Sequence, residues 1–252
     1  MRIAYLPLLA VLLGAAGLAD AANQDSLTLA NAVVTAPDRS PEDRALDAGR
    51  KPAEMLAFLG VQPGWRVADL GAGGGYTTEL LQRSVGSDGM VYGQNSEALL
   101  KMFAEKAWSA RLAKPVMRGV VRLDHDFDDP FPADLAPLDA VTIVLFYHDT
   151  VWLGANREAM NKAVFNALKP GGVFLIVDHS ARAGDGTDVA STFHRIEEAV
   201  VRNEVQAAGF VLDAEADFLR NAKDTRDWND SPRAAGDRRG TSDRFVLRFR
   251  KP

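Results

Sequence analysis

The chain has 252 residues, of which 47% are hydrophobic, a size and composition typical of one α/β domain with a single core. Its net charge of -5, without a basic segment interleaved with aromatic residues, argues against a nucleic-acid partner. The absence of cysteine excludes disulfides, a zinc ribbon, an iron–sulfur cluster and a thiol nucleophile.

The N-terminus has the pattern of an export signal. Arg2 precedes an apolar run that ends at the small-x-small sequence Ala19-Asp20-Ala21. Residues 1–21 are therefore predicted to be a signal peptide, which places the mature protein outside the cytoplasm, in the periplasm, with no stable membrane insertion after cleavage. An uncleaved signal would tether it to the membrane. Residues 22–39 are expected to be disordered or extended, and residues 40–252 to form the domain.

From Ser40 onward, helical and strand patterns alternate. A helix is expected to begin at Ser40, which is a good cap, and to be broken at Pro52. Strands are expected at 65–70, 90–93, 116–123, 140–146, 173–177, 210–215 and 244–249, and helices at 77–85, 96–112, 156–168 and 189–208. Strands separated by helices predict right-handed βαβ units and a mostly parallel sheet, with the last two strands as an antiparallel pair at its edge.

The sharpest motif is the glycine-rich segment 69–77, which lies between a predicted strand and a predicted helix. It reads D-x-G-x-G-x-G. The G-x-G-x-x-G fingerprint of dinucleotide sites fails, because counting from Gly71 or Gly73 puts Tyr76 or Thr78 at the third glycine. A triphosphate-binding P-loop sequence is also absent. The segment therefore indicates a ligand-binding loop for another kind of cofactor.

This loop resembles the first motif of class I S-adenosylmethionine-dependent methyltransferases. The matching positions are Asp69, Gly71, Gly73 and Gly75. The L-K-P-G-G turn at 168–172 is also common in that superfamily, and the resemblance extends from about Ser40 to Lys251. It implies a single Rossmann-like, doubly wound domain with seven strands and S-adenosylmethionine as cofactor. Within the superfamily, the chain looks like a bacterial group of predicted exported methyltransferases.

The resemblance also assigns further cofactor-binding positions. The family places a residue for the ribose hydroxyls at the end of the second strand, where this chain has Asn95 in place of the usual acid. It places an acid and an apolar residue after the third strand, for the adenine amine and ring, and Asp126 and Phe127 match best. The glycine loop is expected to face the methionine part of the cofactor.

Candidate catalytic residues follow the fourth and fifth strands. In a doubly wound sheet, ligands bind beyond the carboxyl ends of the strands. Tyr147, His148 and Asp149 follow the fourth strand there, and His179 follows the fifth. Methyl transfer needs an aligned acceptor and, for some acceptors, removal of a proton, which histidine performs well. We predict His148 or His179 as the base, and Tyr147 or Asp149 as the residue that orients the acceptor or the base.

His194 and Arg195 are predicted to lie on the helix at 189–208. If this helix covers the cleft, they are expected to contact the acceptor, with Arg195 binding an anionic group. The alternative is a helix face whose charges pair with Glu197 and Glu198.

Together these patterns predict a methyltransferase that acts on an oxygen, nitrogen or sulfur of a small-molecule acceptor. The assignment includes no metal site. Two alternatives remain open: a protein with this fold that binds a small ligand without catalysis, and an exported metal-binding protein. The side chains available for a metal would be His125, His148, His179, Asp126, Asp149 and Asp178, although their spacing matches no local metal motif.

Overall fold

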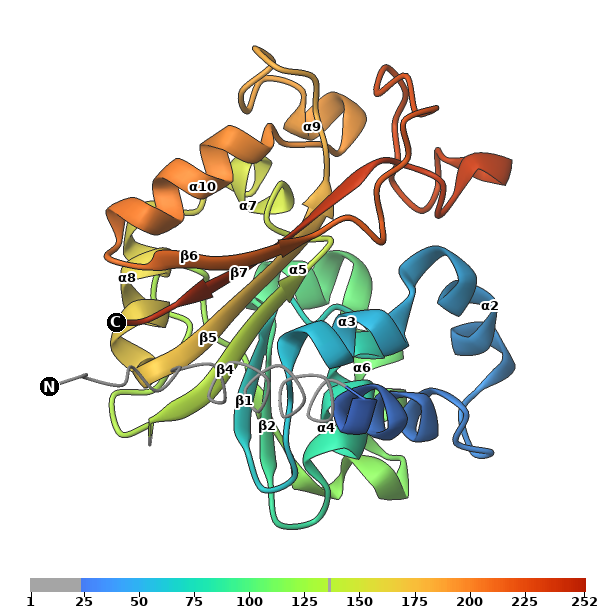
Figure 1. Cartoon of the computed structure of the whole chain (residues 1–252), viewed down its shortest axis with the longest axis vertical. Helices are drawn as coiled ribbons and strands as arrows, with labels where there is room; N and C mark the ends of the chain where they lie inside the picture. Colours follow the sequence, from blue (N-terminus) through green and yellow to red (C-terminus); the bar gives the residue numbers. More distant parts are fainter. Residues whose placement is uncertain (1–23, 136) are drawn as a thin grey trace, which may run out of the picture.

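The computed structural model describes residues 24–135 and 137–252. A central sheet is covered by helices on both faces, and the chain forms one α/β domain (Figure 1). The predicted signal peptide, residues 1–21, lies outside the described residues. Across the two described ranges, no helix has both the length and the apolar character needed to cross a membrane.

Helices and strands alternate through most of the chain, as predicted. In chain order they are α2 (Pro41–Arg50), α3 (Pro52–Leu59), β1 (Arg66–Leu70), α4 (Tyr76–Val85), β2 (Met90–Gln94), α5 (Glu97–Leu99), the π-helical segment η1 (Leu100–Ala104), α6 (Glu105–Leu112), the 3-10 segment η2 (Pro115–Gly119), β3 (Val120–Leu123), β4 (Leu138–Val144), α7 (Asp149–Trp152), α8 (Arg157–Ala167), β5 (Leu168–His179), α9 (Ala190–Phe193), α10 (Glu198–Ala207), β6 (Val211–Ala216), the 3-10 segment η3 (Gly236–Arg238) and β7 (Arg244–Arg250).

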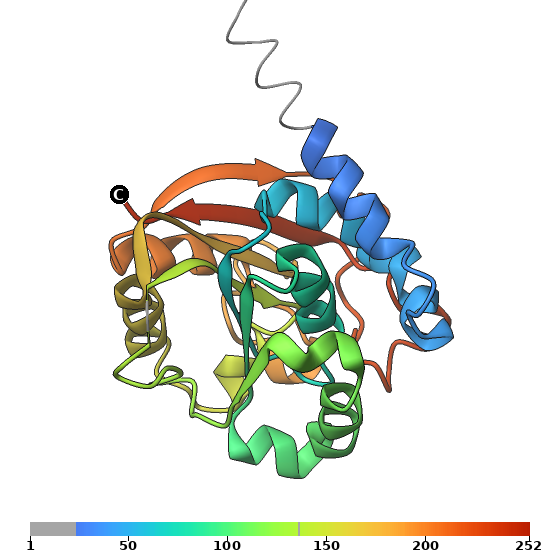
Figure 2. The same ribbon diagram turned by 90° about the horizontal axis from the view of Figure 1, so that it is seen from below.

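The start of the described chain differs from the prediction. Residues 24–34 form a helix, so the expectation of a disordered or extended segment is wrong there. Ala30 and Val33 stand three positions apart, on one face of this helix, and are buried in the same core cluster as α3 and α4. Figure 2 shows the helix lying along α3. Burial of this apolar face stabilises the helix, and the face is too short to stand out in the sequence.

The sheet has the strand order β3-β2-β1-β4-β5-β7-β6. The first five strands are parallel, and β7 runs antiparallel to both of its neighbours, β5 and β6. The predicted antiparallel pair is therefore present at that edge of the sheet, with β7 one position inside and β6 outermost. After β3 the chain returns to the other side of β1, so the strand order reverses between β1 and β4. Such a reversal opens a crevice at the carboxyl ends of the strands.

Both faces of the sheet are buried, and β5 shows why its sequence is apolar without alternation. Phe174 and Ile176 pack in the cluster that contains α8 and α10, whereas Leu175 and Val177 pack in the cluster that contains α3 and α4. The strand is thereby fixed on both sides. This rigidity holds the residues that follow β5, at the crevice, in place.

The predicted helix 189–208 is interrupted. It consists of α9 and α10, separated by residues in which His194 adopts the left-handed conformation, with φ 53°. Ile196 forms a bridge to Ser180, and its amide donates to the carbonyl of His179. These contacts hold the segment against the end of β5 and place His194 at the crevice.

Candidate active site

The carboxyl ends of four strands are level with one another. Leu70 of β1 is in register with Gln94 of β2 and with Ile143 of β4, and Val144 pairs with Val177 of β5. The loops that follow these strands therefore meet at one edge, as the predicted parallel sheet requires. The predicted site residues lie in those loops.

The three motif glycines of the loop have different roles. Gly71, Gly73 and Gly75 all have positive φ, a conformation that other residues rarely adopt. A Cβ at Gly71 would overlap the ring of Phe146, and a Cβ at Gly75 would overlap Trp108. A Cβ at Gly73 would meet no atom closer than the Gly71 carbonyl oxygen, at 4.0 Å. Packing thus requires two of the glycines, and the third presents bare backbone to open space.

Asp69 at the end of β1 is buried and faces inward. Its carboxylate accepts hydrogen bonds from Thr78 Oγ1 at 2.6 Å and Thr142 Oγ1 at 2.8 Å. Burial raises the pKa of Asp69 to about 6, although both hydroxyls favour the ionised form. The aspartate therefore ties β1 to β4 and to α4, and so fixes β1 and α4, the two elements that the glycine loop connects.

Asn95 also holds the loop. Its Oδ1 accepts from the Gly73 amide at 2.8 Å, and its Nδ2 donates to the Gly73 carbonyl at 3.3 Å. The neighbouring Gln94 accepts from the Gly71 amide at 3.1 Å. Asn95 is fully buried, so the position predicted for the ribose hydroxyls fixes the glycine loop. The amide that replaces the usual acid can both donate and accept, which this double contact requires.

Of the two residues predicted to contact adenine, Asp126 is unpaired in the described chain and Phe127 is packed against another ring. Asp126 is exposed, and its carboxylate has no partner in the part of the chain that the structure describes. Phe127 is buried and stacks on Phe146, with ring centroids 5.1 Å apart. Because Phe146 also covers Gly71, these rings form one apolar wall beside the loop.

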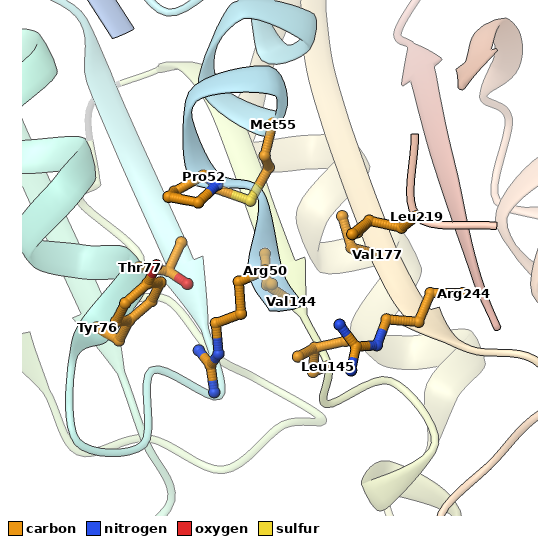
Figure 3. A pocket seen from close by; sticks show the side chains of 10 residues that line it. All are labelled: Arg50, Pro52, Met55, Tyr76, Thr77, Val144, Leu145, Val177, Leu219 and Arg244. Atoms are coloured by element: carbon orange, nitrogen blue, oxygen red, sulfur yellow. The ribbon is translucent and has the colours of Figure 1, made fainter. Parts of the chain in front are cut away.

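Arg50, which no sequence motif marks, lies at a small cavity beside the start of α4. Figure 3 shows Arg50 from α2 and Arg244 from β7 entering this cavity, whose volume of about 10 Å³ is near that of one water molecule. The Arg50 guanidinium lies over the ring of Tyr76, 4.5 Å from its centroid, and makes no hydrogen bond or ion pair within the described residues. Burial lowers its pKa. In the sequence Arg50 is one of two adjacent basic residues, Arg50 and Lys51, before Pro52, and nothing there distinguishes it from its neighbour.

These groups fit S-adenosylmethionine. The unpaired guanidinium of Arg50 beside the start of α4 suits the methionine carboxylate. The open backbone at Gly73 allows close approach of the cofactor, and the free carboxylate of Asp126 can accept from the adenine amine. When bound, the cofactor supplies a methyl group on a positively charged sulfur.

Two histidines and two carboxylates form a cluster at the ends of β4 and β5. His148 Nδ1 lies 2.7 Å from Asp178 Oδ1, and His148 Nε2 lies 3.0 Å from Asp149 Oδ1. His194 Nδ1 lies 3.1 Å from the same Asp149 oxygen and 3.3 Å from His148 Nε2. The structure thus brings together three of the predicted residues, His148, Asp149 and His194, and adds Asp178, for which the sequence suggests only a role as a metal ligand.

The two predicted bases have opposite electrostatics. Burial disfavours the charged form of His148, but the carboxylates of Asp178 and Asp149 outweigh this and raise its pKa to about 10. Burial lowers the pKa of His179 to about 4, against the opposing effect of Asp230. The surrounding carboxylates thus favour the charged form of His148, whereas burial favours the neutral form of His179.

Two predicted residues lie away from this cluster. Tyr147 is buried among α8 and α10, where its hydroxyl donates to Glu204 and accepts from Asn161. Arg195 is fully buried, pairs with Asp224 at 2.8 Å and lies over the Trp228 ring. Both make structural contacts here, and neither faces the crevice residues described above.

Known proteins show the same fold. The structure superposes on a SAM-dependent methyltransferase from Aquifex aeolicus with a TM-score of 0.60 and 15% identity, covering 84% of this chain and 97% of the other. It also matches Aeropyrum pernix fibrillarin in complex with natively bound S-adenosyl-L-methionine, with a TM-score of 0.53 and 15% identity, over 81% and 76% of the two chains. These likenesses establish the fold.

Similarity in sequence establishes the family. Residues 41–212 match the family described as Protein-L-isoaspartate(D-aspartate) O-methyltransferase. A trans-aconitate 2-methyltransferase of Variovorax paradoxus (strain S110) is 30% identical over 131 residues, which are 52% of this chain and 45% of that protein. The match thus spans less than half the length of this relative. The glycine loop, the strand order and the matched range lead to one conclusion: the chain belongs to the Protein-L-isoaspartate(D-aspartate) O-methyltransferase family of class I methyltransferases, whose cofactor is S-adenosylmethionine.

Proposed function

We propose that this protein methylates a carboxylic acid group of a small-molecule acceptor, bound where β4 and β5 end. Transfer is an in-line displacement at the cofactor's methyl carbon, so the protein has to align the acceptor oxygen with that carbon. The acceptor oxygen forms the new bond to carbon as the bond from carbon to sulfur breaks. The products are a methyl ester and S-adenosylhomocysteine.

One observation carries the choice of acceptor. Both ring nitrogens of His148 are engaged by carboxylates, Nδ1 by Asp178 and Nε2 by Asp149. His148 therefore has no ring nitrogen free to remove a proton from an acceptor. A carboxylic acid is already ionised at neutral pH and needs no base, unlike an alcohol or an amine. Because His148 cannot act as a base, the site suits an acceptor that is already deprotonated when it binds.

The similar proteins support this choice. The family description names isoaspartate, and the curated relative is named for trans-aconitate. Both compounds are carboxylic acids. The two names differ in the size of the molecule that carries the acid, and we favour a small molecule on the name of the curated relative.

The test is a transfer assay with cofactor labelled in its methyl group. The purified protein is incubated with di- and tricarboxylic acids, an isoaspartyl peptide, an amine, an alcohol and a thiol. We expect labelled product with a small acid, and we expect alkali to release its label as methanol because the product is an ester. Alkali-stable label on the amine, alcohol or thiol would contradict the acid proposal. Ester formed on the peptide alone would contradict the small-molecule part.

His179→Gln provides a control for base catalysis. A positioned general base contributes roughly 10²–10⁴-fold to a rate, so its loss is easily measured. For a carboxylate acceptor we expect His179→Gln to keep its rate within about tenfold of the parent. A loss of about a hundredfold or more, with cofactor affinity unchanged, would identify His179 as a base and count against the carboxylate.

Export is proposed on the N-terminal pattern alone, from Arg2 to Ala21. N-terminal sequencing of the protein recovered from the periplasmic fraction of a bacterial host tests it. A mature protein that begins near residue 22 is the expected result. Full-length protein confined to the cytoplasm would contradict it.

A further inference from the structure

We propose that His148, Asp149 and His194 bind a divalent transition-metal ion. Their ligand atoms are His148 Nε2, Asp149 Oδ1 and His194 Nδ1, which lie 3.0, 3.1 and 3.3 Å from one another. The three groups come from segments 46 residues apart in the chain and converge on one point. This inference does not depend on the identity of the methyl acceptor.

The triangle of ligand atoms has the size of a coordination site. Zinc binds histidine nitrogen and carboxylate oxygen at about 2.0–2.2 Å. Two such ligands at a tetrahedral angle are about 3.3 Å apart, and at a right angle about 2.9 Å apart. The three observed separations fall between these limits. An ion can therefore contact all three atoms without a change in the backbone.

Hydrogen bonds from neighbouring residues orient the ligands, as is usual around metal-bound side chains. A histidine that binds a metal through one nitrogen commonly donates from the other to a carboxylate. Here Asp178 Oδ1 lies 2.7 Å from His148 Nδ1. The backbone amides of His148 and His179 donate to the same carboxylate and hold it in place. This leaves Nε2 directed at Asp149 and His194. Trp152 Nε1 donates to Asp149 Oδ1 at 2.7 Å, and this hydrogen bond fixes the carboxylate ligand.

The position of His194 is also built into the fold. Its left-handed backbone ends α9, and the bridge between Ile196 and Ser180 then holds the segment against β5. His194 is partly exposed, with 22% of its side chain accessible, so an ion can enter from that side. Three protein ligands leave coordination positions open to water or to an oxygen of a bound molecule.

The ligand types select the class of ion. Two imidazoles and one carboxylate suit zinc, iron, manganese and similar ions. Magnesium and calcium prefer sites made of oxygen. The site lies on the same edge of the sheet as the glycine loop, since Phe146, which covers Gly71, is two residues before His148.

The test uses the full chain without a histidine tag, stripped with a chelator and titrated with zinc by calorimetry. We expect one zinc ion per chain, no binding of magnesium, and visible absorption bands when cobalt replaces zinc. The titration contains no S-adenosylmethionine, so its result is separate from that of the methyl-transfer assay. Failure of zinc, iron, manganese and cobalt to bind at micromolar concentrations would overturn the proposal.

Matched variants locate the ion. His194→Asn removes a ligand and keeps a residue that tolerates the left-handed conformation. We expect it and Asp149→Asn to weaken zinc at least tenfold, and Asp178→Asn to weaken it about tenfold to a hundredfold. His125→Asn is the control, because the His125 ring has no partner in the described chain and is outside the triangle. Unchanged affinity in His194→Asn, or an equal loss in His125→Asn, would show that the ion binds elsewhere.

Discussion

Asp178 holds His148 by both of its carboxylate oxygens. Oδ1 lies 2.7 Å from the ring Nδ1, and Oδ2 accepts from the backbone amide at 2.7 Å. Both side chains are almost fully buried, with 0% and 2% accessible surface. Through this pair the end of β5 is joined to the loop after β4, where the candidate site is built.

Asp178→Asn should destabilise the protein by about 1.5–3 kcal/mol, because a buried, charge-assisted hydrogen bond to His148 is weakened while Asp149 still faces the other ring nitrogen. Urea unfolding of parent and variant measures this difference. Asp126→Asn is the matched control: that carboxylate is exposed and unpaired in the described chain, so its loss should change stability by less than about 0.5 kcal/mol. A cost below about 1 kcal/mol at Asp178 would mean that the pair contributes little.

Gly71→Ala and Gly73→Ala should separate packing from binding. At Gly71 the new methyl group meets Phe146 in addition to the cost of positive φ, so we expect a loss of about 3 kcal/mol or more. At Gly73 the space is open, so only the backbone cost of about 1–2 kcal/mol applies. The methyl group at Gly73 instead occupies the face proposed for the cofactor.

Calorimetric titration with S-adenosylmethionine completes this comparison. Gly73→Ala is expected to stay folded and to bind the cofactor at least tenfold more weakly. A Gly73→Ala variant with parental affinity would show that the cofactor does not approach the loop at this residue. Equal unfolding free energies of the two variants would contradict the packing described for Phe146.

The sequence predicted the sheet and the loop because their signals are local. Short apolar strands, the glycines after Leu70 and the polar residues after β4 and β5 are each legible within about ten residues. The rule that parallel strands end at one edge then placed His148, Asp149 and His179 there correctly. What the residues contact at that edge depends on packing. The Asn95 amide could bind ribose hydroxyls, and only the fold shows that it is already hydrogen-bonded to Gly73.

Residues on the interrupted helix could not be assigned for a similar reason. The sequence around His194 has a helical pattern, but pairing with the end of β5 breaks the helix and turns His194 toward His148. The same break buries Arg195 against Asp224, where it no longer faces a ligand. Arg50 was missed because its distinguishing feature is the lack of a partner, which no sequence pattern records.

Arg50→Gln should weaken cofactor binding and spare the fold. A charge-assisted hydrogen bond contributes about 1.5–3 kcal/mol, so affinity for S-adenosylmethionine should fall about tenfold to a hundredfold. Without the cofactor the guanidinium has no ion-pair partner among the described residues and only its contact with the Tyr76 ring is lost, so stability should change by less than about 1 kcal/mol.

Arg118→Gln is the control for this arginine. Arg118 is exposed and has no partner within the described ranges, so its replacement should change neither affinity nor stability. Calorimetry and urea unfolding of both variants give the two readouts. If Arg50→Gln binds as tightly as the parent, the carboxylate of the cofactor lies elsewhere. If it unfolds more easily, the guanidinium has a structural role.

The buried carboxyl group of Asp69 should give stability an unusual pH dependence. Its pKa is about 6 in the folded protein, above the ordinary value of 3.8. A group whose pKa is raised by folding binds its proton more tightly in the folded state. Its contribution to stability is therefore largest at pH values below the unfolded pKa and is lost as pH rises through about 6.

Asp69→Asn removes this dependence, because asparagine does not titrate and can still accept from Thr78 or Thr142. Relative to the parent, the variant should gain about 2 kcal/mol in unfolding free energy between pH 4.5 and 7.5. The comparison is a difference between two proteins, so carboxylates common to both, which titrate in the same range, cancel. Urea unfolding at several pH values measures it. A constant difference would show that Asp69 is ionised throughout this range, which would mean that the two threonines stabilise the carboxylate at least as much as burial disfavours it.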